Sequence, residues 1–520
     1  MESPTRSPLA APPSHVADLV ARAAARTPDH AAIIDVTSGI TLGWAELDAA
    51  VTAEAQRLAG EGVTGGDRVL VRLANGAGFC ITLLGALRAG AVAVPFGPVG
   101  VARELEIVLA DCRPAVMVAA EGDEAAARCG SSAQVRLLPA PDPAARPSGP
   151  APDRGPGGEE IALLVYTSGT TGSPRGVQLS HRALLANRAQ TAALRPAPVI
   201  PVDRVLLSLP LFHIFGLAAG FLQVCWAGAT VVLTERFEPA TVAGVLVEQR
   251  VSGMAGVPSM FRAMLELPAE RLREATAGLR LCTSGGAPLP PELLAAFQEA
   301  TGLPIHEGYG LTEGGPVLTT NVGRAVKPGS VGRPLPGVEL RLVDAVGNPI
   351  DAVTEPDPEE LDEDVNDPSQ DTGLVAVCGP NLFSGYWPDG SGGPDAEGWF
   401  RTADVGFLDS DGDLHLVDRS SDLVIVNGFN VYPREVEQVL GELPAVAESA
   451  VVGVPDERSG EAVKAVVVRA DGAELTEEEV LAHCGERLAR FKVPTVVEFV
   501  DALPRTPTGK VARRQLAGRA

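Results

Sequence analysis

Short apolar runs alternate with amphipathic segments over the first half of the chain. The apolar runs have the length of buried strands and lie at residues 31–35, 68–73, 91–98, 115–119, 161–165, 204–210, 229–233 and 251–257. Segments with helical periodicity lie between them, at residues 15–26, 44–58, 79–89, 104–111, 216–225, 240–249 and 259–266. This alternation predicts an α/β fold with a largely parallel sheet.

Two stretches interrupt the alternation. Residues 139–159 are rich in Pro and Gly, which predicts a linker rather than a packed element. Residues 354–371 carry nine carboxylates and no basic residue, which predicts an exposed insert. A calcium site is the alternative, but this insert lacks the alternating ligands and central Gly of an EF-hand loop.

Composition narrows the class of protein. A chain of 520 residues is too long for one compact core, so we expect two or more domains. The net charge of −24, with only four Trp and four Tyr, argues against nucleic acid and anionic membrane surfaces as partners. Seven scattered Cys without CxxC spacing indicate neither a disulfide framework nor a zinc site. With no secretion signal and no apolar run of membrane-spanning length, we expect a cytoplasmic protein without a membrane span.

The stretch YTSGTTGSPRGV, residues 166–177, concentrates hydroxyls and glycines around one cation, Arg175. It follows the strand-like run 161–165 and precedes a segment that Ser180 can cap as a helix. Glycines let the backbone approach oxyanions, and the hydroxyls can donate hydrogen bonds. An ordinary surface turn is the alternative. The stretch predicts a phosphate-binding loop between a strand and a helix, with phosphate contacts from Thr167, Ser168, Gly169, Thr170, Thr171, Gly172 and Arg175.

The same stretch lacks the GK ending of a Walker loop. It resembles instead the signature of the adenylate-forming superfamily, which comprises acyl-CoA synthetases, luciferases and the adenylation domains of peptide synthetases. That family usually has Lys where this chain has Arg175. The resemblance implies that the loop holds the β- and γ-phosphates of ATP.

His213 lies in the apolar segment LPLFHIFGL. Taken alone, a His in such surroundings is more often a satisfied core residue. In the resembling acyl-CoA synthetases, an aromatic residue or His at this motif lines the acyl pocket near the carboxyl group. In the resembling adenylation domains for amino acids, an Asp in this segment holds the ammonium group of the substrate, and this chain has none there. Residues 209–232 contain no Asp, Glu, Lys or Arg, which also argues against dicarboxylates as substrates.

Two further segments resemble the nucleotide-contact motifs of the family. The turn SGGAPLP, residues 284–290, resembles the adenine-contact segment, which implies that Gly285, Gly286 and Ala287 lie beside the base. The segment HEGYGLTEGG contains the pattern YGxTE. The resemblance places the Tyr309 ring near adenine, the Thr312 hydroxyl at the α-phosphate, and the Glu313 carboxylate on Mg²⁺. In isolation, each segment would be only a turn.

The last third of the chain also follows the family pattern. WFRTADVG resembles the ribose-binding segment, with Asp404 as a bidentate acceptor for the two ribose hydroxyls. Arg419 is expected on the ribose or phosphate, and Gly428 in the stretch that lines the pantetheine tunnel. The usual hinge residue is Asp or Lys, and Ser421 stands there. Near the C-terminus, PRTPTGKVARRQL resembles the catalytic-lysine motif, which implies that Lys510 stabilises charge on the α-phosphate.

The resemblance covers nearly the whole chain. It implies a large N-terminal domain of mainly parallel β-sheets packed with helices, residues 1–420, and a small mobile α+β C-terminal domain, residues 421–520. We expect an AMP-forming acyl-CoA synthetase that uses ATP, CoA and Mg²⁺ to activate an apolar monocarboxylic acid, such as a fatty acid. The alternative is a freestanding acyl-AMP ligase that loads a separate acyl carrier protein. A nucleotide-binding module without turnover is a further alternative, which Glu313, Asp404 and Lys510 argue against.

Overall fold

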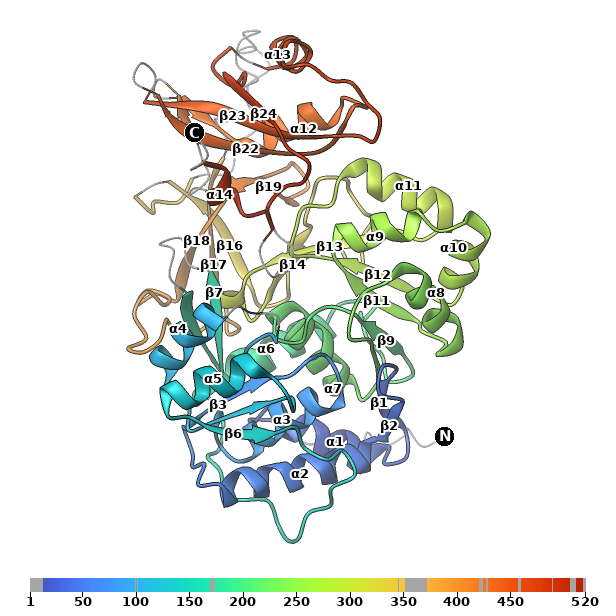
Figure 1. Cartoon of the computed structure of the whole chain (residues 1–520), viewed down its shortest axis with the longest axis vertical. Coiled ribbons are helices and arrows are strands. Elements are labelled where there is room, and N and C mark those ends of the chain that lie inside the picture. Colours follow the sequence, from blue (N-terminus) through green and yellow to red (C-terminus); the bar gives the residue numbers. More distant parts are fainter. Residues whose placement is uncertain are drawn as a thin grey trace, which may run out of the picture. The chain divides into compact units, whose positions relative to one another are not determined.

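The computed structural model describes residues 13–98, 100, 102–168, 174–344, 346–350, 372–419, 424–426, 429–456, 460–488, 490–505 and 511–517. The chain divides into two compact units (Figure 1). The first comprises Met1–Glu339 and Cys378–Phe400, and the second comprises Leu340–Val377 and Arg401–Ala520.

Two sheets build the first unit. Across the larger sheet the strands follow the order β15 (Arg333–Pro334), β14 (Val317–Thr320), β13 (Ile305–Gly310), β12 (Leu281–Ser284), β11 (Gly253–Gly256), β9 (Arg204–Leu207), β10 (Thr230–Leu233), β1 (Ala31–Asp35) and β2 (Ile40–Gly43). Its central strands, from β13 to β1, pair in parallel, and the outer strands pair antiparallel. Across the smaller sheet the order is β6 (Arg136–Pro139), β5 (Val116–Ala119), β3 (Arg68–Arg72), β4 (Val92–Pro95), β7 (Ile161–Ser168) and β8 (Pro174–Ser180).

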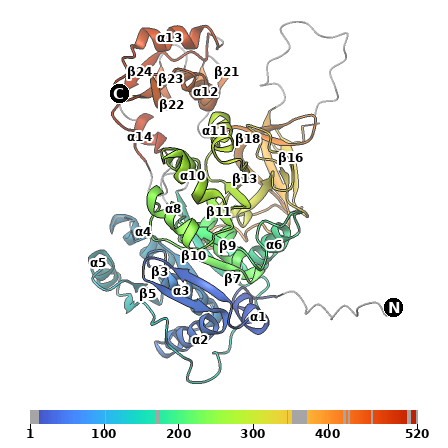
Figure 2. The ribbon, with the colours of Figure 1, turned by 90° about the vertical axis from the view of Figure 1, so that its right-hand side faces the viewer.

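Helices cover the faces of both sheets. Between the sheets lie α1 (Asp18–Arg26), α2 (Trp44–Gly60), α3 (Ala77–Arg88), α6 (His181–Ala192), the π-helix η1 (Phe215–Leu222) and α7 (Gln223–Ala227). On the outer face of the larger sheet lie α8 (Pro239–Glu248), α9 (Pro258–Leu265), α10 (Ala269–Thr276) and α11 (Pro291–Thr301), several of which are in front in Figure 2. The outer face of the smaller sheet carries α4 (Ala102–Cys112) and α5 (Glu124–Ala133).

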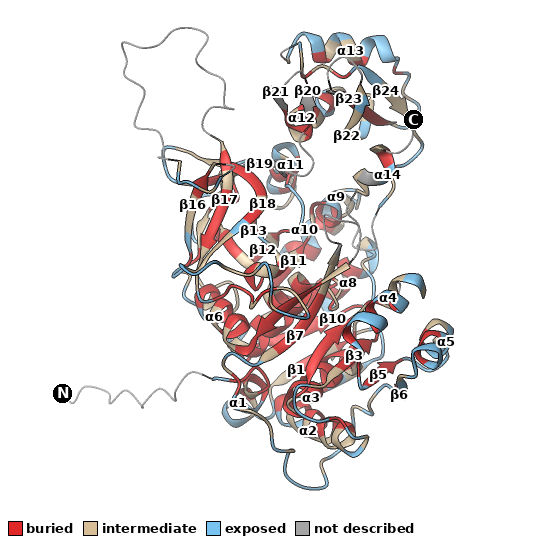
Figure 3. Ribbon diagram, turned by 90° about the vertical axis from the view of Figure 1, so that its left-hand side faces the viewer, coloured by how far each residue is buried: buried red, intermediate tan, exposed pale blue. Residues whose placement is uncertain are grey.

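The period-two pattern of the strands explains this layering. In β9, Val205 and Leu207 belong to the core between the sheets, whereas Leu206 belongs to the core under α8 to α11. Likewise Val69 in β3 faces the shared core, and Leu70 faces the core under α4 and α5. Strands buried on both faces read as continuous apolar runs, and they are largely red in Figure 3. The predicted α/β class with mainly parallel sheets is therefore confirmed.

The second unit contains two further sheets. One has the order β16 (Glu339–Val343), β17 (Gly373–Cys378), β18 (Trp399–Leu408) and β19 (Leu414–Arg419). The other has the order β21 (Phe429–Val431), β20 (Val424–Val426), β23 (Gly460–Arg469) and β22 (Val446–Asp456), with β24 (Val496–Phe499) also on β23. Helices α12 (Pro433–Gly441) and α13 (Glu477–Gly485) pack on one face of this sheet, and α14 (Arg513–Ala517) packs on the other.

The predicted linker, residues 139–159, is irregular apart from Pro139, which ends β6. Helix α5 and strand β6, just before this linker, were not predicted. The acidic insert, residues 354–371, and the hinge residue Ser421 lie outside the described residues. The domain boundary at residue 421 stays a prediction. In the part of the chain that the structure describes, every helix is too short or too polar to cross a membrane.

A buried pair of histidines joins the N-terminal segment to the start of α6. The ring centroids of His15 and His181 are 3.7 Å apart. Each Nδ1 accepts a backbone hydrogen bond, from Ala17 N to His15 at 3.2 Å and from Val16 N to His181 at 3.1 Å. Burial, and after it the neighbouring His181 and Arg154, lowers the pKa of His15 to about 2, and burial together with Arg154 lowers the pKa of His181 to about 3. Both rings are therefore neutral in the folded protein near pH 7.

This pair predicts that acid destabilises the fold. Both pKa values are depressed in the folded state, so the unfolded chain binds more protons once the pH falls below about 6.5. Each histidine should then remove up to about 1.4 kcal/mol of unfolding free energy per pH unit, down to its folded pKa. Urea unfolding of the protein between pH 7 and pH 4.5 measures this slope. His181→Asn keeps an acceptor oxygen but does not titrate, so its slope should be shallower, and an equal slope would contradict the assignment.

Candidate active site

The stretch predicted to bind phosphate is the end of a β-hairpin. Strands β7 and β8 pair antiparallel, with Thr167 opposite Arg175 and Ser168 opposite Pro174. Residues 169–173, which join them, lie outside the described residues, as does the side chain of Ser168. The hairpin therefore places Thr167 and Arg175 side by side at the base of the connecting loop.

The order of elements differs from the strand, loop and helix that the sequence predicts. Ser180 does cap a helix, because its hydroxyl accepts from Ala183 N at 3.1 Å and α6 begins at His181. However, strand β8 lies between the loop and this helix. Strand β8 was not predicted, because it is short and its first residues, Pro174 and Arg175, are typical of a loop.

A segment from far along the sequence lies against β8. Gln178 exchanges backbone hydrogen bonds with it, from Gln178 N to Gly385 O at 3.1 Å and from Ser384 N to Gln178 O at 2.9 Å. The Gln178 amide also donates to Tyr386 O at 3.1 Å. Trp387 N donates to Gly176 O at 2.8 Å, and Gly176 has no room for a side chain because a Cβ would lie 2.8 Å from Leu164. Main-chain bonds and the Gln178 amide thus fix the backbone of Tyr386 beside the phosphate hairpin.

Tyr386 links the cation of the hairpin to the carboxylate of the YGxTE motif. The guanidinium carbon of Arg175 lies 3.7 Å from the centroid of the Tyr386 ring. The Tyr386 hydroxyl donates to Oε1 of Glu313 at 2.7 Å. Burial, and then the Glu313 charge, raises the pKa of Tyr386 well above its usual value, so the phenol remains a donor at neutral pH.

Thr312 and Glu313 lie in a tight turn that follows β13. The turn is a short 3-10 helix, Thr312–Gly314, in which Thr312 is buried and Glu313 is half-buried. Gly310 enters the turn so closely that a Cβ there would lie 1.8 Å from Pro316 O. The Asn381 amide donates to Gly314 O at 2.7 Å, and Phe383 N donates to Glu313 O at 2.9 Å. These bonds therefore hold the main chain of the turn that carries Glu313.

The predicted adenine-contact turn lies against the predicted acyl segment. Gly285 is buried, and a Cβ there would lie 3.3 Å from the Phe215 ring and 3.5 Å from Gly308 O. Gly286 has φ +78°, and both Gly286 and Ala287 are exposed. Gly308 directly precedes Tyr309 in β13, and the Tyr309 ring is buried. The turn thus lies between strand β13 and the start of η1.

His213 stands just before the π-helix η1. It is half-buried, and its Nδ1 accepts from Phe215 N at 3.3 Å. Its backbone oxygen accepts from Leu217 N at 2.9 Å. Gly216 packs tightly at this point, since a Cβ would lie 2.5 Å from Pro210 O. A π-helix is a rare form that occurs often at functional sites, and here it sets the direction of the His213 backbone.

Arg188 connects the π-helix η1, which follows His213, to the turn that carries Glu313. This arginine of α6 is completely buried, and burial lowers the pKa of its guanidinium to about 9. It donates to Ala218 O in η1 and to Gly315 O, two residues after Glu313. Its guanidinium also donates to Oδ1 of Asn187, and within the described residues it forms no ion pair, so carbonyl and amide dipoles balance its charge. The sequence analysis missed this residue because an Arg in a helix reads as exposed.

The other predicted site residues belong to the second unit. Asp404 is buried in β18, opposite Arg419 of β19, and its backbone N donates to the Thr402 hydroxyl at 3.1 Å. The side chain of Arg419 is not among the described ones. Gly428 and Lys510 lie outside the described residues. The roles of these four residues stay predictions.

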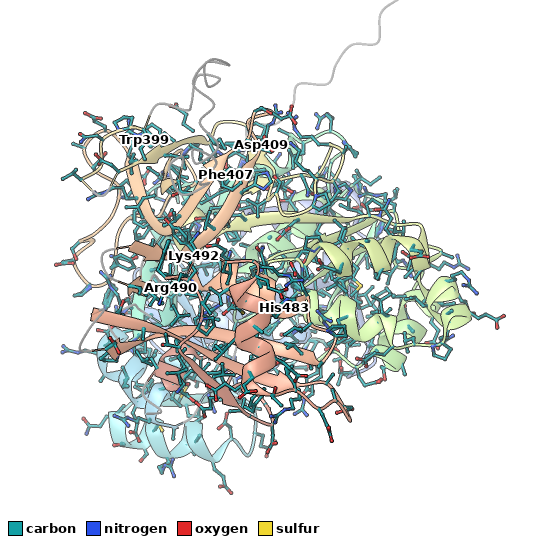
Figure 4. The ribbon with its side chains drawn as sticks, turned by 90° about the horizontal axis from the view of Figure 1, so that it is seen from above. Trp399, Phe407, Asp409, His483, Arg490 and Lys492 are labelled. Atoms are coloured by element: carbon teal, nitrogen blue, oxygen red, sulfur yellow. The ribbon has the colours of Figure 1, made fainter. Side chains whose placement is uncertain are left out.

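An acidic turn in the second unit is a second candidate for cation binding. Oxygens of Asp409, Asp411 and Asp413 lie within 4.8 Å of one another in the turn between β18 and β19, where Asp409 and Phe407 are drawn in Figure 4. Asp409 Oδ1 accepts from the backbone N of Asp411 and of Asp413, each at 3.0 Å. Its Oδ2 lies 2.9 Å from Nε2 of His415. These bonds account for the cluster as an ordinary turn, and Glu313 remains the better candidate.

Sequence reasoning missed Tyr386 and its supports. Tyr386 is 73 residues beyond Glu313, and Gln178 is 208 residues before Tyr386, so no local pattern connects them. The available signal was a single Tyr within the Gly-rich segment SGYWPDGSGG. Ser284 was quoted only as the start of a turn, and its buried hydroxyl has no hydrogen-bond partner among the described residues.

Comparisons with known proteins agree with these motifs. Residues 20–387 match the model of the AMP-binding enzyme family, and residues 435–510 match the model of the AMP-binding enzyme C-terminal domain. A feruloyl-CoA synthase from Amycolatopsis sp. is 37% identical over 488 residues, covering 92% of this chain and 94% of that protein. The long-chain-fatty-acid–CoA ligase FadD13 of Mycobacterium tuberculosis is 33% identical over 501 residues, covering 93% and 94%. The crystal structure of ATP-bound MatB from Rhodopseudomonas palustris superposes with a TM-score of 0.85 at 32% identity, covering 96% and 98%.

The packing of the carboxylate turn leads to a prediction. Gly310→Ala should displace the turn that carries Thr312 and Glu313, because the new Cβ would overlap Pro316 O. We expect a loss of about 3 kcal/mol of stability, measured by chemical unfolding, together with loss of ATP-dependent activity. Gly60→Ala is the matched control, since Gly60 ends α2 with nothing within 4 Å of its added Cβ. A stable and fully active Gly310→Ala variant would contradict the proposed tight turn.

Proposed function

Because the chain belongs to the AMP-binding enzyme family and its relatives are CoA ligases, we propose that it activates an apolar monocarboxylic acid, such as a fatty acid, as a CoA thioester. The observation that carries the proposal is a pair of contact lines in the first unit that end on β13 and on the turn after it. One runs from Arg175 through Tyr386 to Glu313, and the other from His213 and Phe215 through Gly285 to Gly308. The triphosphate and the acyl group would then be bound along one strand and its following turn.

The reaction divides into two steps. A carboxylate oxygen of the acid attacks the α-phosphorus of ATP, the bond from this phosphorus to the bridging oxygen breaks, and pyrophosphate leaves. The CoA thiol then attacks the acyl carbon, its proton is lost, and the bond to the AMP oxygen breaks. We assign Thr312 to the α-phosphate and Lys510 to the charge that develops there during the first step. Asp404 and Arg419 would hold the ribose, and Gly428 would line the path of the pantetheine.

The residues present are compatible with a divalent cation. Glu313 is a half-buried carboxylate with one oxygen fixed by the Tyr386 hydroxyl, and carboxylate oxygens are the ligands that Mg²⁺ prefers. When bound, Mg²⁺ would neutralise charge on the phosphate oxygens. The chain's own cation, Arg175, would contact the β- or γ-phosphate together with the hydroxyls of the 166–177 stretch.

The apolar acyl segment supports the class of acid. Leu211, Ile214 and Leu217, which surround His213 in sequence, are each at most 2% exposed. A second carboxylate or an ammonium group in this environment would need a buried partner of opposite charge, and residues 209–232 contain none. The buried Arg188 contacts this segment at Ala218 O, but its guanidinium already donates to Ala218 O, Asn187 Oδ1 and Gly315 O. A cytoplasmic location remains an expectation from the sequence.

A substrate panel tests the proposal. Purified protein, MgATP and CoA are incubated with straight-chain fatty acids, a cinnamic-type acid, a dicarboxylic acid and an amino acid, and AMP and thioester are measured. We expect both products with apolar monocarboxylic acids only. Accumulation of acyl-AMP without thioester would favour the alternative, a ligase that loads a separate acyl carrier protein. Preference for the dicarboxylic acid would contradict the proposed acyl pocket.

Lys510 provides a prediction that separates the two steps. Lys510→Ala should slow adenylate formation about 100-fold or more, because a cation that stabilises the α-phosphate is lost. The variant should still form thioester from supplied acyl-AMP and CoA, since the thiol attacks the acyl carbon in this step and not the α-phosphorus. Pyrophosphate exchange measures the first step, and thioester release from acyl-AMP measures the second. Equal losses in both steps would contradict this role.

A further inference from the structure

We propose that Tyr386 is a positioning residue with two separable parts: its hydroxyl orients the Glu313 carboxylate toward a divalent cation, and its ring seats the Arg175 guanidinium for the triphosphate. The inference rests on the proposed function in taking Glu313 as the cation ligand. It goes further because it assigns one side chain to both the metal and the anion side of the site.

The hydroxyl part follows from the geometry of the carboxylate. Tyr386 donates to Oε1 of Glu313 at 2.7 Å, and none of the described residues donates to Oε2. One oxygen is therefore held while the other can face a cation. A half-buried carboxylate on a turn has several side-chain rotamers, and a donor from a different segment selects one of them.

The ring part follows from the position of Arg175. Its guanidinium carbon lies 3.7 Å from the ring centroid, a stacking distance for a planar cation on an aromatic face. This contact occupies one face of the guanidinium and leaves the N–H groups at its edge able to donate. A guanidinium suits this place better than an ammonium, because it can stack on a ring and still present a planar fork to phosphate oxygens.

The support of Tyr386 is rigid enough for this role. Its backbone is held on both sides, by the Gln178 amide at Tyr386 O and by Ser391 O, which accepts from Tyr386 N at 2.9 Å. The ring of Phe383 packs edge-on against it, with centroids 5.1 Å apart. Gly392 also approaches the ring, since a Cβ there would lie 3.0 Å from it. The ring therefore has a fixed place between the hairpin and the carboxylate turn.

Two variants separate the two parts. Tyr386→Phe keeps the ring and removes the hydroxyl, so it should raise the free Mg²⁺ concentration for half-maximal AMP formation roughly tenfold. The same variant should weaken Mn²⁺ binding in the presence of ATP, measured by electron paramagnetic resonance, and leave binding of metal-free ATP unchanged. Tyr386→Leu removes ring and hydroxyl, so it should also weaken metal-free ATP binding, about threefold.

The controls keep the result interpretable. Tyr432→Phe removes a phenol whose hydroxyl lies 3.3 Å from Thr372 in the second unit, and the Mg²⁺ dependence of adenylate formation should not change. Unchanged binding of metal-free ATP also shows that Tyr386→Phe is folded. If Tyr386→Phe has the metal dependence of the unmodified protein, or needs less Mg²⁺, the inference is wrong.

The outcome also distinguishes this inference from the proposed function. If the unmodified protein forms AMP with no acid tested, the proposed function fails, but the Mn²⁺ measurement still tests the role of Tyr386. If thioesters form as proposed and Tyr386→Phe changes neither the Mn²⁺ affinity nor the Mg²⁺ dependence, only the role of Tyr386 fails.

Discussion

The backbone bonds between β8 and residues 384–387 are the constraint on which the candidate site depends. They pair a distant segment with the phosphate hairpin in an isolated antiparallel bridge, and Phe383 N extends the connection to Glu313 O. Main-chain bonds of this kind involve no side-chain rotamers, so they hold their geometry before any ligand arrives. Electrostatic groups that are already oriented need no reorganisation during a reaction, which is the condition for strong charge stabilisation.

The buried guanidinium of Arg188 also joins two parts of the candidate site. Arg188 spans from Ala218 O in η1 to Gly315 O after the carboxylate turn. The neighbouring Asn187 side chain binds the backbone of Val317, two residues after Gly315. Its Oδ1 accepts from Val317 N at 3.1 Å, and its Nδ2 donates to Val317 O at 2.7 Å. A completely buried guanidinium is costly unless its N–H groups are hydrogen-bonded, and the carbonyl oxygens of Ala218 and Gly315 and Oδ1 of Asn187 accept from it. Shifting η1 without shifting the turn would break these bonds, so the acyl and phosphate sides are mechanically connected.

The sequence predicted most of the fold because parallel strands buried on both faces are continuous apolar runs. Strands such as Ala31–Asp35 and helices such as α2 were placed within a few residues. Strand β8 was missed because Pro174 and Arg175 open it and hide its alternation. The π-helix was expected as an ordinary helix, since an apolar run that is buried all round has no period that distinguishes the two.

The candidate site was only partly predictable for a different reason. Motifs identified residues such as Glu313 and Arg175 because their chemistry is local: a carboxylate after a Thr, or a cation among glycines. Tyr386 has no such signal. Its importance arises from a hydrogen bond and a stacking contact that exist only once three distant segments meet.

Residues on both sides of Lys510 are bound to other parts of the second unit, and this limits how Lys510 can move toward or away from a phosphate. Arg505 and Val511, which flank the undescribed residues 506–510, form an antiparallel bridge, and Arg505 lies 2.6 Å from Glu448. Arg513 pairs with Glu437 of α12 at 2.6 Å, and the buried Lys464 ammonium donates to Leu516 O at 3.3 Å. Both ends of the stretch that carries Lys510 are thus fastened to the second unit. If Lys510 serves only the first step, withdrawing it together with the part of the chain after Ser421, which contains Glu437, Glu448 and Lys464, breaks none of these bonds, whereas peeling away the segment alone would break several. We therefore expect any change between the two steps to occur as a rigid-body motion of the predicted C-terminal domain, residues 421–520, about the predicted hinge at Ser421.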